Sequence, residues 1–234
     1  MTRFRIATYN VHKCRGIDWR VDISRIATVL SEVDADIFAL QEVLSRQAVC
    51  LTRHINMLHI FGVAEVRSGQ DYGNAVFSRF PVKGFENYDL TVKGRERRQC
   101  LRAEISIGEK TSVNFFAVHL GTSFFERRKQ AAALVSKEVL ERPDVKGTRI
   151  VTGDFNEWTR GLATRMLTRH LESADLMTHL GRTRTYPGVA PFMHLDHIYY
   201  DPVFHLTAMH LHRSRAALVG SDHLPLVADF ELRL

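Results

Sequence analysis

The sequence has little cysteine and no long hydrophobic run. Its three cysteines, Cys14, Cys50 and Cys100, lie far apart without a C-x-x-C pair, which argues against a disulfide framework or a structural zinc site. No apolar run approaches the roughly 18 residues that a membrane-spanning helix needs. Residues 1–5 lead into a strand-like pattern without the apolar core of a signal peptide. We therefore expect a cytoplasmic protein, with peripheral contact to a membrane surface left open.

The composition is that of an ordinary globular protein. Hydrophobic residues make up 45% and charged residues 25% of the 234 residues. Because no repeat, linker or low-complexity stretch interrupts the chain, we expect a single domain over residues 1–234. The net charge of +6 favours anionic partners, namely nucleic acid, phospholipid head groups or phosphorylated metabolites, without choosing among them. Nothing in the pattern indicates an oligomeric state.

Hydrophobic periodicity predicts many short strands and few helices. Apolar runs rich in β-formers predict strands over residues 4–9, 36–40, 61–66, 74–78, 84–91, 102–107, 113–118, 149–153, 193–200, 203–211 and 224–232. Helical spacing predicts helices over residues 22–30, 46–58, 124–140 and 162–170. Residues 175–191 are expected to be irregular. Together these elements predict two packed sheets flanked by helices.

The stretch Gly153-Asp154-Phe155-Asn156 follows one of the predicted strands. Glycine lets the backbone turn sharply. If the chain stays extended there, Asp154 and Asn156 leave the same face. A carboxylate beside an amide suits a polar reaction centre, because the carboxylate can hold a water or a metal and the amide can donate to a phosphoryl oxygen. The alternative is a turn closed by local side-chain hydrogen bonds.

Polar side chains recur where the predicted strands end. In a layered β architecture, strands that end on one edge can bring such side chains into one pocket. A single histidine or aspartate at a strand end is usually structural, but a recurring pattern predicts a shared site. The pattern occurs at Asn10, Glu42, His119, Asp154 with Asn156, Asp196, and Asp222 with His223.

These residues resemble the endonuclease/exonuclease/phosphatase family of metal-dependent phosphoesterases. The resemblance implies an α/β fold, a DNase I-like four-layer α/β-sandwich in which helices flank two mainly antiparallel sheets. It also implies Mg²⁺- or Mn²⁺-assisted hydrolysis of a phosphate ester. The matching motifs cover nearly the whole chain in order: TYN with Asn10, LQEV with Glu42, residues 72–82, VHLGT with His119, GDFN with Asp154, LDHIYY with Asp196, and GSDHLPLVADF with Asp222 and His223.

The resemblance implies a metal region near the start of the chain. Glu42 is the expected metal ligand, Asn10 lies beside it, and Asp222 serves the same region. A site rich in carboxylate and amide, in a chain with little cysteine, also favours Mg²⁺ or Mn²⁺ over zinc on its own chemistry. Many nucleases of the family carry an acidic residue where His12 stands. His12 is therefore expected either to contact metal or phosphate, or to be a strand-end histidine bonded to a neighbour.

The resemblance implies a catalytic role for five further residues. Asp154 is expected to orient or deprotonate the attacking water, and Asn156 to hold a phosphoryl oxygen. His223 is expected to contact the phosphate as donor or base, with Asp196 fixing its tautomer. His119 is expected to donate to the phosphate or to the leaving oxygen.

The charged loop of residues 94–99 adds one tentative substrate ligand. It is similar to a Glu-x-Arg element of small bacterial members, and Arg98 there could fork onto a phosphate. The alternative is a solvated charged turn. Three basic residues, Arg127, Arg128 and Lys129, begin the predicted helix after His119, and we expect them to form a solvated face.

Three functions remain open at this stage. The first is a phosphodiesterase acting on a lipid or small phosphodiester, favoured by the short chain and by His119. The second is a nuclease, favoured by the basic charge, although no inserted loop rich in aromatic and basic residues is present to grip a duplex. The third is a non-catalytic binding module on the same fold, which is disfavoured because the expected catalytic set is intact.

Overall fold

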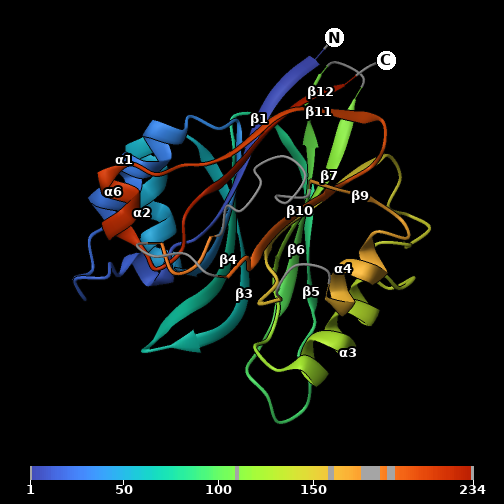
Figure 1. The fold of residues 1–234 in the computed structure, drawn as a ribbon, viewed down its shortest axis with the longest axis horizontal. Helices are drawn as coiled ribbons and strands as arrows, with labels where there is room; N and C mark the ends of the chain where they lie inside the picture. The colour runs from blue at the N-terminus through green and yellow to red at the C-terminus, as the bar shows by residue number, and fades with distance from the viewer. Residues whose placement is uncertain (1, 109–110, 158–160, 175–184, 189–192, 233–234) are drawn as a thin grey trace.

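Two six-stranded sheets pack face to face in the computed structural model, which describes residues 2–108, 111–157, 161–174, 185–188 and 193–232 (Figure 1). The first sheet has the order β11-β12-β1-β2-β4-β3, with strands Phe204–Leu211, Leu226–Leu232, Thr2–Asn10, Ile37–Leu44, Gln70–Ser78 and Leu58–Arg67. The second has the order β5-β6-β7-β8-β10-β9, with strands Val82–Asp89, Gln99–Ser106, Ser112–His119, Thr148–Asp154, Asp196–Tyr200 and Glu172–Ser173.

Each sheet is antiparallel except for one parallel pair. β1 and β2 run parallel in the first sheet, and β7 and β8 run parallel in the second. Parallel strands end on the same edge, so the carboxyl ends of all four strands are available to build one site. β12 and β10 run antiparallel to β1 and β8 and therefore begin where those strands end.

Helices cover the outer face of each sheet. In the first layer lie α1 (Ile23–Val33), α2 (Ser45–Ile55) and α6 (Arg215–Gly220), which pack on the first sheet (Figure 1). In the fourth layer, α3 (Phe124–Leu134) and α4 (Leu162–Leu167) pack on the second sheet (Figure 1). This arrangement confirms the predicted four-layer α/β-sandwich. Among the described residues, no helix has the length and apolar character needed to cross a membrane.

Side chains alternate between the two faces of each strand, so the apolar residues of one strand divide between two cores. In β1, Phe4 and Ile6 belong to the core between the sheets, whereas Ala7 and Tyr9 belong to the core under the helices. Asn10, at an even position like Phe4 and Ile6, therefore points between the sheets. The alternation that places Phe4 and Ile6 in the core thus also directs Asn10, the last residue of β1, between the two sheets.

Several element boundaries differ from the predictions. The helix predicted over 124–140 ends at Leu134, and turns follow, because the Ser136 side chain bonds the Ala133 carbonyl and accepts from the Glu138 N–H. The helix predicted over 46–58 ends at Ile55 and is followed by left-handed Asn56, with φ 51°. Leu58 already belongs to β3.

Other differences concern short elements. The strand predicted over 193–200 covers only Asp196–Tyr200, and α4 ends at Leu167 instead of residue 170. The two-residue strand β9 and the helix α6 were not predicted, because such short segments have no clear period. The irregular segment predicted over 175–191 lies largely outside the described residues, and its described part, 185–188, bonds back to residue 193 through a bridge at Tyr186.

Gly153 is required where β8 approaches β7. Its φ is 148°, and a Cβ there would lie 1.9 Å from the carbonyl oxygen of Val118. We expect Gly153→Ala to lower the free energy of unfolding by roughly 3 kcal/mol, from backbone strain plus the clash. Gly84→Ala is the control, since a Cβ at Gly84 in β5 meets no atom within 4 Å. Equal effects of the two substitutions in denaturant unfolding would contradict this account.

Candidate active site

Side chains alternate between the two faces of each strand, and along three strands of the second sheet this alternation places polar side chains between the two sheets. In β7, Phe115 and Ala117 belong to the core between the sheets, so His119 follows on the same face. The same parity aims Asp154 of β8 and Asp196 of β10 between the sheets. In the register, His119 is opposite Asp154, and Asp154 is opposite Asp196. Three titratable side chains therefore lie side by side.

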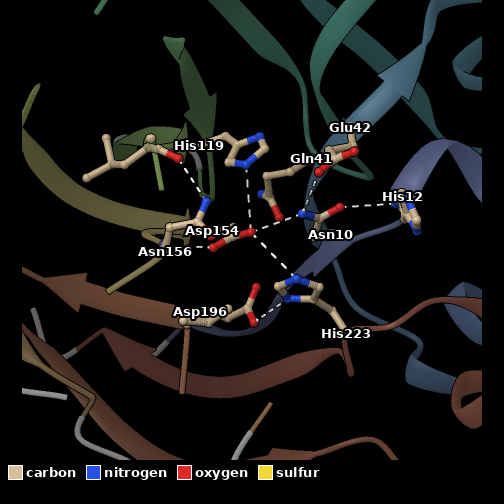
Figure 2. A network of polar contacts seen from close by, with 12 residues as sticks. Asn10, His12, Gln41, Glu42, His119, Asp154, Asn156, Asp196 and His223 are labelled. Carbon is tan, nitrogen blue, oxygen red and sulfur yellow. Dashed lines mark hydrogen bonds and ion pairs between the residues drawn. The ribbon is translucent and has the colours of Figure 1, made fainter. Parts of the chain in front are cut away.

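Asp154 is the centre of the polar network (Figure 2). Its Oδ2 accepts a hydrogen bond from Asn10 Nδ2 at 3.0 Å, which joins the two sheets across the gap. The same oxygen lies 3.7 Å from His119 Nε2 and 3.7 Å from His223 Nε2. Its Oδ1 accepts from the backbone N–H of Asn156 at 2.8 Å. The carboxylate is buried and lies between two imidazoles, and as a positioned carboxylate it can accept a proton from a water.

His223 is held by Asp196. Its Nδ1 lies 2.9 Å from Asp196 Oδ2, so Nδ1 donates to this carboxylate and Nε2 faces Asp154. Burial acts to lower the pKa of His223, but the charges of Asp196 and Asp154 raise it to about 10. The ring of Tyr186 packs against the imidazole at 4.9 Å between centroids. In the arrangement shown by the structure, His223 is thus a buried cation that can donate a hydrogen bond.

His119 has the opposite protonation state. Burial, and then the positive charge of Arg98, lower the pKa of His119 to about 4, against the effect of Asp154. The imidazole is therefore neutral at pH 7, while His223 on the other side of Asp154 is cationic. Two titratable groups with pKa values pushed in opposite directions are typical of an acid–base site.

An irregularity in β2 directs the side chain of Glu42 toward the site. Phe38 and Leu40 of β2 face the helices, and simple alternation would send Glu42 the same way. The pairing of β2 with β4 shifts register between Leu40 and Val43, and Glu42 has a φ of 56°. Glu42 lies beside Asn10, whose Nδ2 is 3.3 Å from Glu42 Oε1. β2 therefore extends past the predicted end at residue 40, and its bulge aims the carboxylate.

Lys13 keeps Glu42 ionised. Its Nζ lies 2.8 Å from Glu42 Oε2. Burial acts to raise the pKa of Glu42, but His119 and Lys13 together hold it well below its usual range. Because His119 is neutral at pH 7, Lys13 supplies the charge that acts there. Lys13 was not singled out in the sequence, although it directly follows the strand-end residues Asn10 and His12.

The donor set at this corner suits Mg²⁺ or Mn²⁺. Among the described residues, no three His, Cys, Asp or Glu side chains gather closely enough to hold a metal by themselves. Mg²⁺ commonly binds through one or two carboxylates, with waters and substrate phosphate oxygens as its other ligands. The ionised Glu42, the neighbouring Asn10 and the cleft-lining Asp222 fit that mode. They lack the cysteine and histidine ligands that predominate in zinc sites.

The structure places Asn156 and His12 at the margins of the network. Asn156 has a φ of 48°, so the strand does not continue through it. Its Nδ2 donates to the Leu120 carbonyl at 2.9 Å, which leaves its second amide hydrogen for a ligand. His12 Nδ1 lies 3.6 Å from Asp222 Oδ1, and its backbone N–H donates to Asn10 Oδ1 at 3.0 Å. His12 thus contacts two residues that line the cleft, Asn10 and Asp222.

Arg98 lies in the cleft wall and is buried. Its Nη2 is 2.7 Å from Glu96 Oε2, and its Nε has no partner among the described residues. The solvated turn that sequence reasoning considered for Arg98 is therefore wrong for the side chain itself, because the residue is only 6% exposed. Its neighbours in the loop, residues 93–97, are exposed. The guanidinium lines the cleft and brings a positive charge toward an anionic ligand there.

These residues line one cleft of about 790 Å³. We call the polar side of its lining, which the network around Asp154 forms, the floor of the cleft. One part of the wall is apolar and consists of Phe124, Leu162, Tyr186, Met193 and Leu195. Tyr186 was missed by sequence reasoning because it lies in the segment expected to be irregular. The cleft can therefore hold an anionic group at its floor and an apolar group at its wall.

A buried histidine next to the site predicts acid-sensitive stability. Burial, and then the nearby His197, lower the pKa of His194 from 6.5 to about 2. Below pH 6.5 the unfolded chain takes up a proton that the folded protein does not. The free energy of unfolding therefore falls by about 1.4 kcal/mol per pH unit from this group as the pH drops, and this contribution is fully present above that pH.

Between pH 6.5 and about pH 5, we therefore expect the free energy of unfolding to fall by roughly 2 kcal/mol less in His194→Gln than in the original chain. The measurement is denaturant unfolding at several pH values. His205→Gln is the matched control, because His205 is an exposed histidine on β11. If both variants keep the slope of the original chain, His194 does not carry this effect.

The sequence matches the model of the Endonuclease/Exonuclease/phosphatase family over residues 7–223, and the chain belongs to this family. Members of the family are generally hydrolases that act on phosphate esters, and they typically use divalent metal ions. The resemblance noted from the motifs is thereby confirmed.

Individual relatives share the full length of the chain. YbhP, an uncharacterized protein of Escherichia coli strain K12, is 32% identical over 251 residues, covering 98% of this chain and 96% of YbhP. A family member from Bacteroides vulgatus has a TM-score of 0.83 at 20% identity, with 100% of each chain covered. A mannosyl-6-phosphatase of Bacteroides thetaiotaomicron has a TM-score of 0.80 at 19% identity, covering 99% of this chain and 100% of that one. At such identities the two structures show the fold alone.

Proposed function

We propose that the chain, as one domain over residues 1–234, is a metal-dependent phosphodiesterase that acts on a small or lipid phosphodiester. The observation that carries the proposal is the position of Asp154. This buried carboxylate lies 3.7 Å from one neutral and one cationic imidazole, and it is bonded to Asn10 beside the ionised Glu42. Such a site has a base, cationic and neutral hydrogen-bond donors, and a metal corner within one cleft.

The proposed reaction is an in-line hydrolysis. Asp154 takes a proton from a water whose oxygen bonds to phosphorus, while the bond from phosphorus to the leaving oxygen breaks. The leaving oxygen takes up one proton from solvent and departs as an alcohol, and Asp154 returns its proton to solvent, so that diester plus water gives monoester plus alcohol. A divalent ion held by Glu42, Asn10 and Asp222 would stabilise negative charge on the phosphoryl and leaving oxygens.

The other side chains act on the phosphate. His223 donates from Nε2 to a phosphoryl oxygen, and Asp196 keeps it cationic and correctly oriented. His119, being neutral, donates a hydrogen bond to the phosphate or the leaving oxygen. Asn156 offers its free amide hydrogen to this anion, and the Arg98 guanidinium, which lines the cleft, adds a positive charge.

The cleft supports a diester as the substrate. A phosphate monoester carries one organic group, whereas the cleft extends from the polar floor to an apolar wall and also borders Arg98 and Arg127. Organic groups on both sides of the phosphorus can be accommodated. The basic charge of +6 favours a nuclease as the second candidate. Against it, the sequence has no inserted loop rich in aromatic and basic residues to grip a duplex.

The test is hydrolysis of a chromogenic phosphodiester beside the matching monoester and a single-stranded oligonucleotide, with Mg²⁺, with Mn²⁺ and with chelator. We expect cleavage of the diester with either ion, slower cleavage of the monoester, and none with chelator. Cleavage of the monoester alone would replace this proposal with a phosphatase. Preferential cleavage of the oligonucleotide, with affinity that falls steeply with salt, would replace it with a nuclease.

A further inference from the structure

The first turn of α3 exposes two adjacent phenylalanines beside the cleft. Phe124 is 54% exposed and Phe125 is 72% exposed, and their rings meet edge to face at 5.6 Å. The helix buries its opposite side, through Glu126, Gln130 and residues further along. The phenylalanines are therefore held outward by the packing of the helix, and they do not contribute to its core.

Two exposed cations lie one turn further along the same face. Arg128 follows Phe124 by four residues, and Lys129 follows Phe125 by four residues, so each cation lies behind one aromatic ring. Both side chains are exposed, and neither forms an ion pair within the described part of the chain. We call Phe124, Phe125, Arg128 and Lys129 the α3 patch.

The spacing within the α3 patch fits the depth profile of a bilayer surface. One helical turn advances about 5.4 Å, so when α3 meets a bilayer with its first turn foremost, the rings reach deeper than the cations behind them. Phenylalanine has no polar group and gains from burial among acyl chains, whereas lysine and arginine are attracted to anionic head groups. The rings and the charges thus match the two layers that an amphipathic membrane contact requires.

The patch adjoins the mouth of the cleft. Phe124 and Arg127 both line the cleft, and Arg127 holds the preceding loop through the carbonyl of Gly121 at 3.3 Å and that of Thr122. Gln130 Oε1 accepts from the Gly121 N–H at 2.8 Å, which fixes the same loop from the buried side. A surface bound to the patch would therefore lie next to the opening that leads to Asp154.

We propose that the α3 patch docks on a phospholipid bilayer that contains anionic lipids and presents head-group phosphates to the cleft. The docking itself stands on the exposed rings and charges alone, whereas the fate of the head group rests on the proposed function. A nucleic acid is a poorer occupant, because the patch has only Arg128 and Lys129 to neutralise a continuous line of phosphates.

The experiment is sedimentation of the full chain with vesicles of phosphatidylcholine, with and without phosphatidylglycerol, in the presence of chelator so that no turnover occurs. We expect binding to the anionic vesicles. Phe125→Ser should weaken that binding about tenfold or more, through lost burial of the ring. Arg128→Gln with Lys129→Gln should weaken it by about fivefold per charge.

The matched controls lie away from the patch. Phe85→Ser removes a ring that is 58% exposed on β5, and Arg53→Gln with Lys83→Gln removes two exposed cations from α2 and β5. These variants should bind vesicles as the original chain does. Absence of vesicle binding by the original chain overturns the proposal. So do equal losses in controls and patch variants, or patch-dependent binding to a single-stranded oligonucleotide without vesicle binding.

A second readout separates docking from chemistry. Phe125→Ser should hydrolyse a water-soluble chromogenic diester at the original rate and should lose turnover only on vesicle substrates. If the original chain binds vesicles through the patch but hydrolyses no diester, the docking stands and the proposed function fails. If it hydrolyses soluble diesters but ignores vesicles, the proposed function stands and the docking is overturned.

Discussion

Asp154→Asn is expected to lower metal-dependent turnover of a phosphodiester by about 10³-fold, the effect of removing a positioned general base. The substitution keeps the size of the side chain and one acceptor oxygen. It removes the negative charge that lies 3.7 Å from both His119 and His223. The measurement is kcat on a chromogenic diester, with substrate binding followed separately.

Asp229→Asn is the control for this change. Asp229 pairs with Arg5 at 2.7 Å in the first sheet and lies outside the residues that line the cleft. It should leave turnover unchanged. Thermal unfolding of both variants shows whether either one is misfolded. Full activity of a folded Asp154→Asn variant would remove Asp154 from the mechanism.

His223→Ala is expected to cost far more turnover than His12→Ala, with losses of about 10³-fold against less than about tenfold. His223 is buried, donates to Asp196 at 2.9 Å and faces Asp154. Its raised pKa makes it a cation at neutral pH, so its removal takes a charged donor from the phosphate site. His12 is partly exposed and lies 3.6 Å from Asp222 without lining the cleft.

The two histidine variants act as each other's control, since both remove an imidazole within the same region. Asp196→Asn extends the comparison, because loss of the carboxylate leaves His223 in place without its partner. We expect it to lower turnover by about 10²-fold through the orientation of His223. Turnover that falls more in His12→Ala than in His223→Ala would reverse the assignment of roles.

Strand parity explains why much of the site was predictable from the sequence. The alternation that marks Phe115 and Ala117 as core also aims His119 into the gap, and the same holds for Asp154 and Asp196. The motifs that carry these residues lie at strand ends, so a correct assignment of strands places them on one edge. The layered architecture followed from the same periodicity.

Local irregularity explains what could not be predicted. Glu42 reaches the site through a bulge and a positive φ, which alternation alone would have excluded. Lys13 is the middle one of three consecutive residues with positive φ, between His12 and Cys14, a conformation without a sequence signal here. The α3 boundary was set by Ser136, whose local hydrogen bonds compete with the helix.

A hydrogen bond on the floor of the site joins the two sheets. Asn10 belongs to the first sheet and Asp154 to the second, and the 3.0 Å bond between them links the proposed metal ligands to the proposed base. Farther from the floor, Asn74 of β4 donates to the Ala117 carbonyl of β7 at 3.2 Å and links the same two sheets. These bonds fix the spacing of groups that come from opposite halves of the fold.

The most direct test of the account is diester turnover as a function of Mg²⁺ concentration, measured for the original chain and for Glu42→Gln. The account predicts no turnover without metal, saturation of the original chain, and a requirement for at least about tenfold more Mg²⁺ in Glu42→Gln, since the variant lacks the carboxylate beside Asn10. Turnover that persists in chelator, or identical metal dependence of the two proteins, would contradict it.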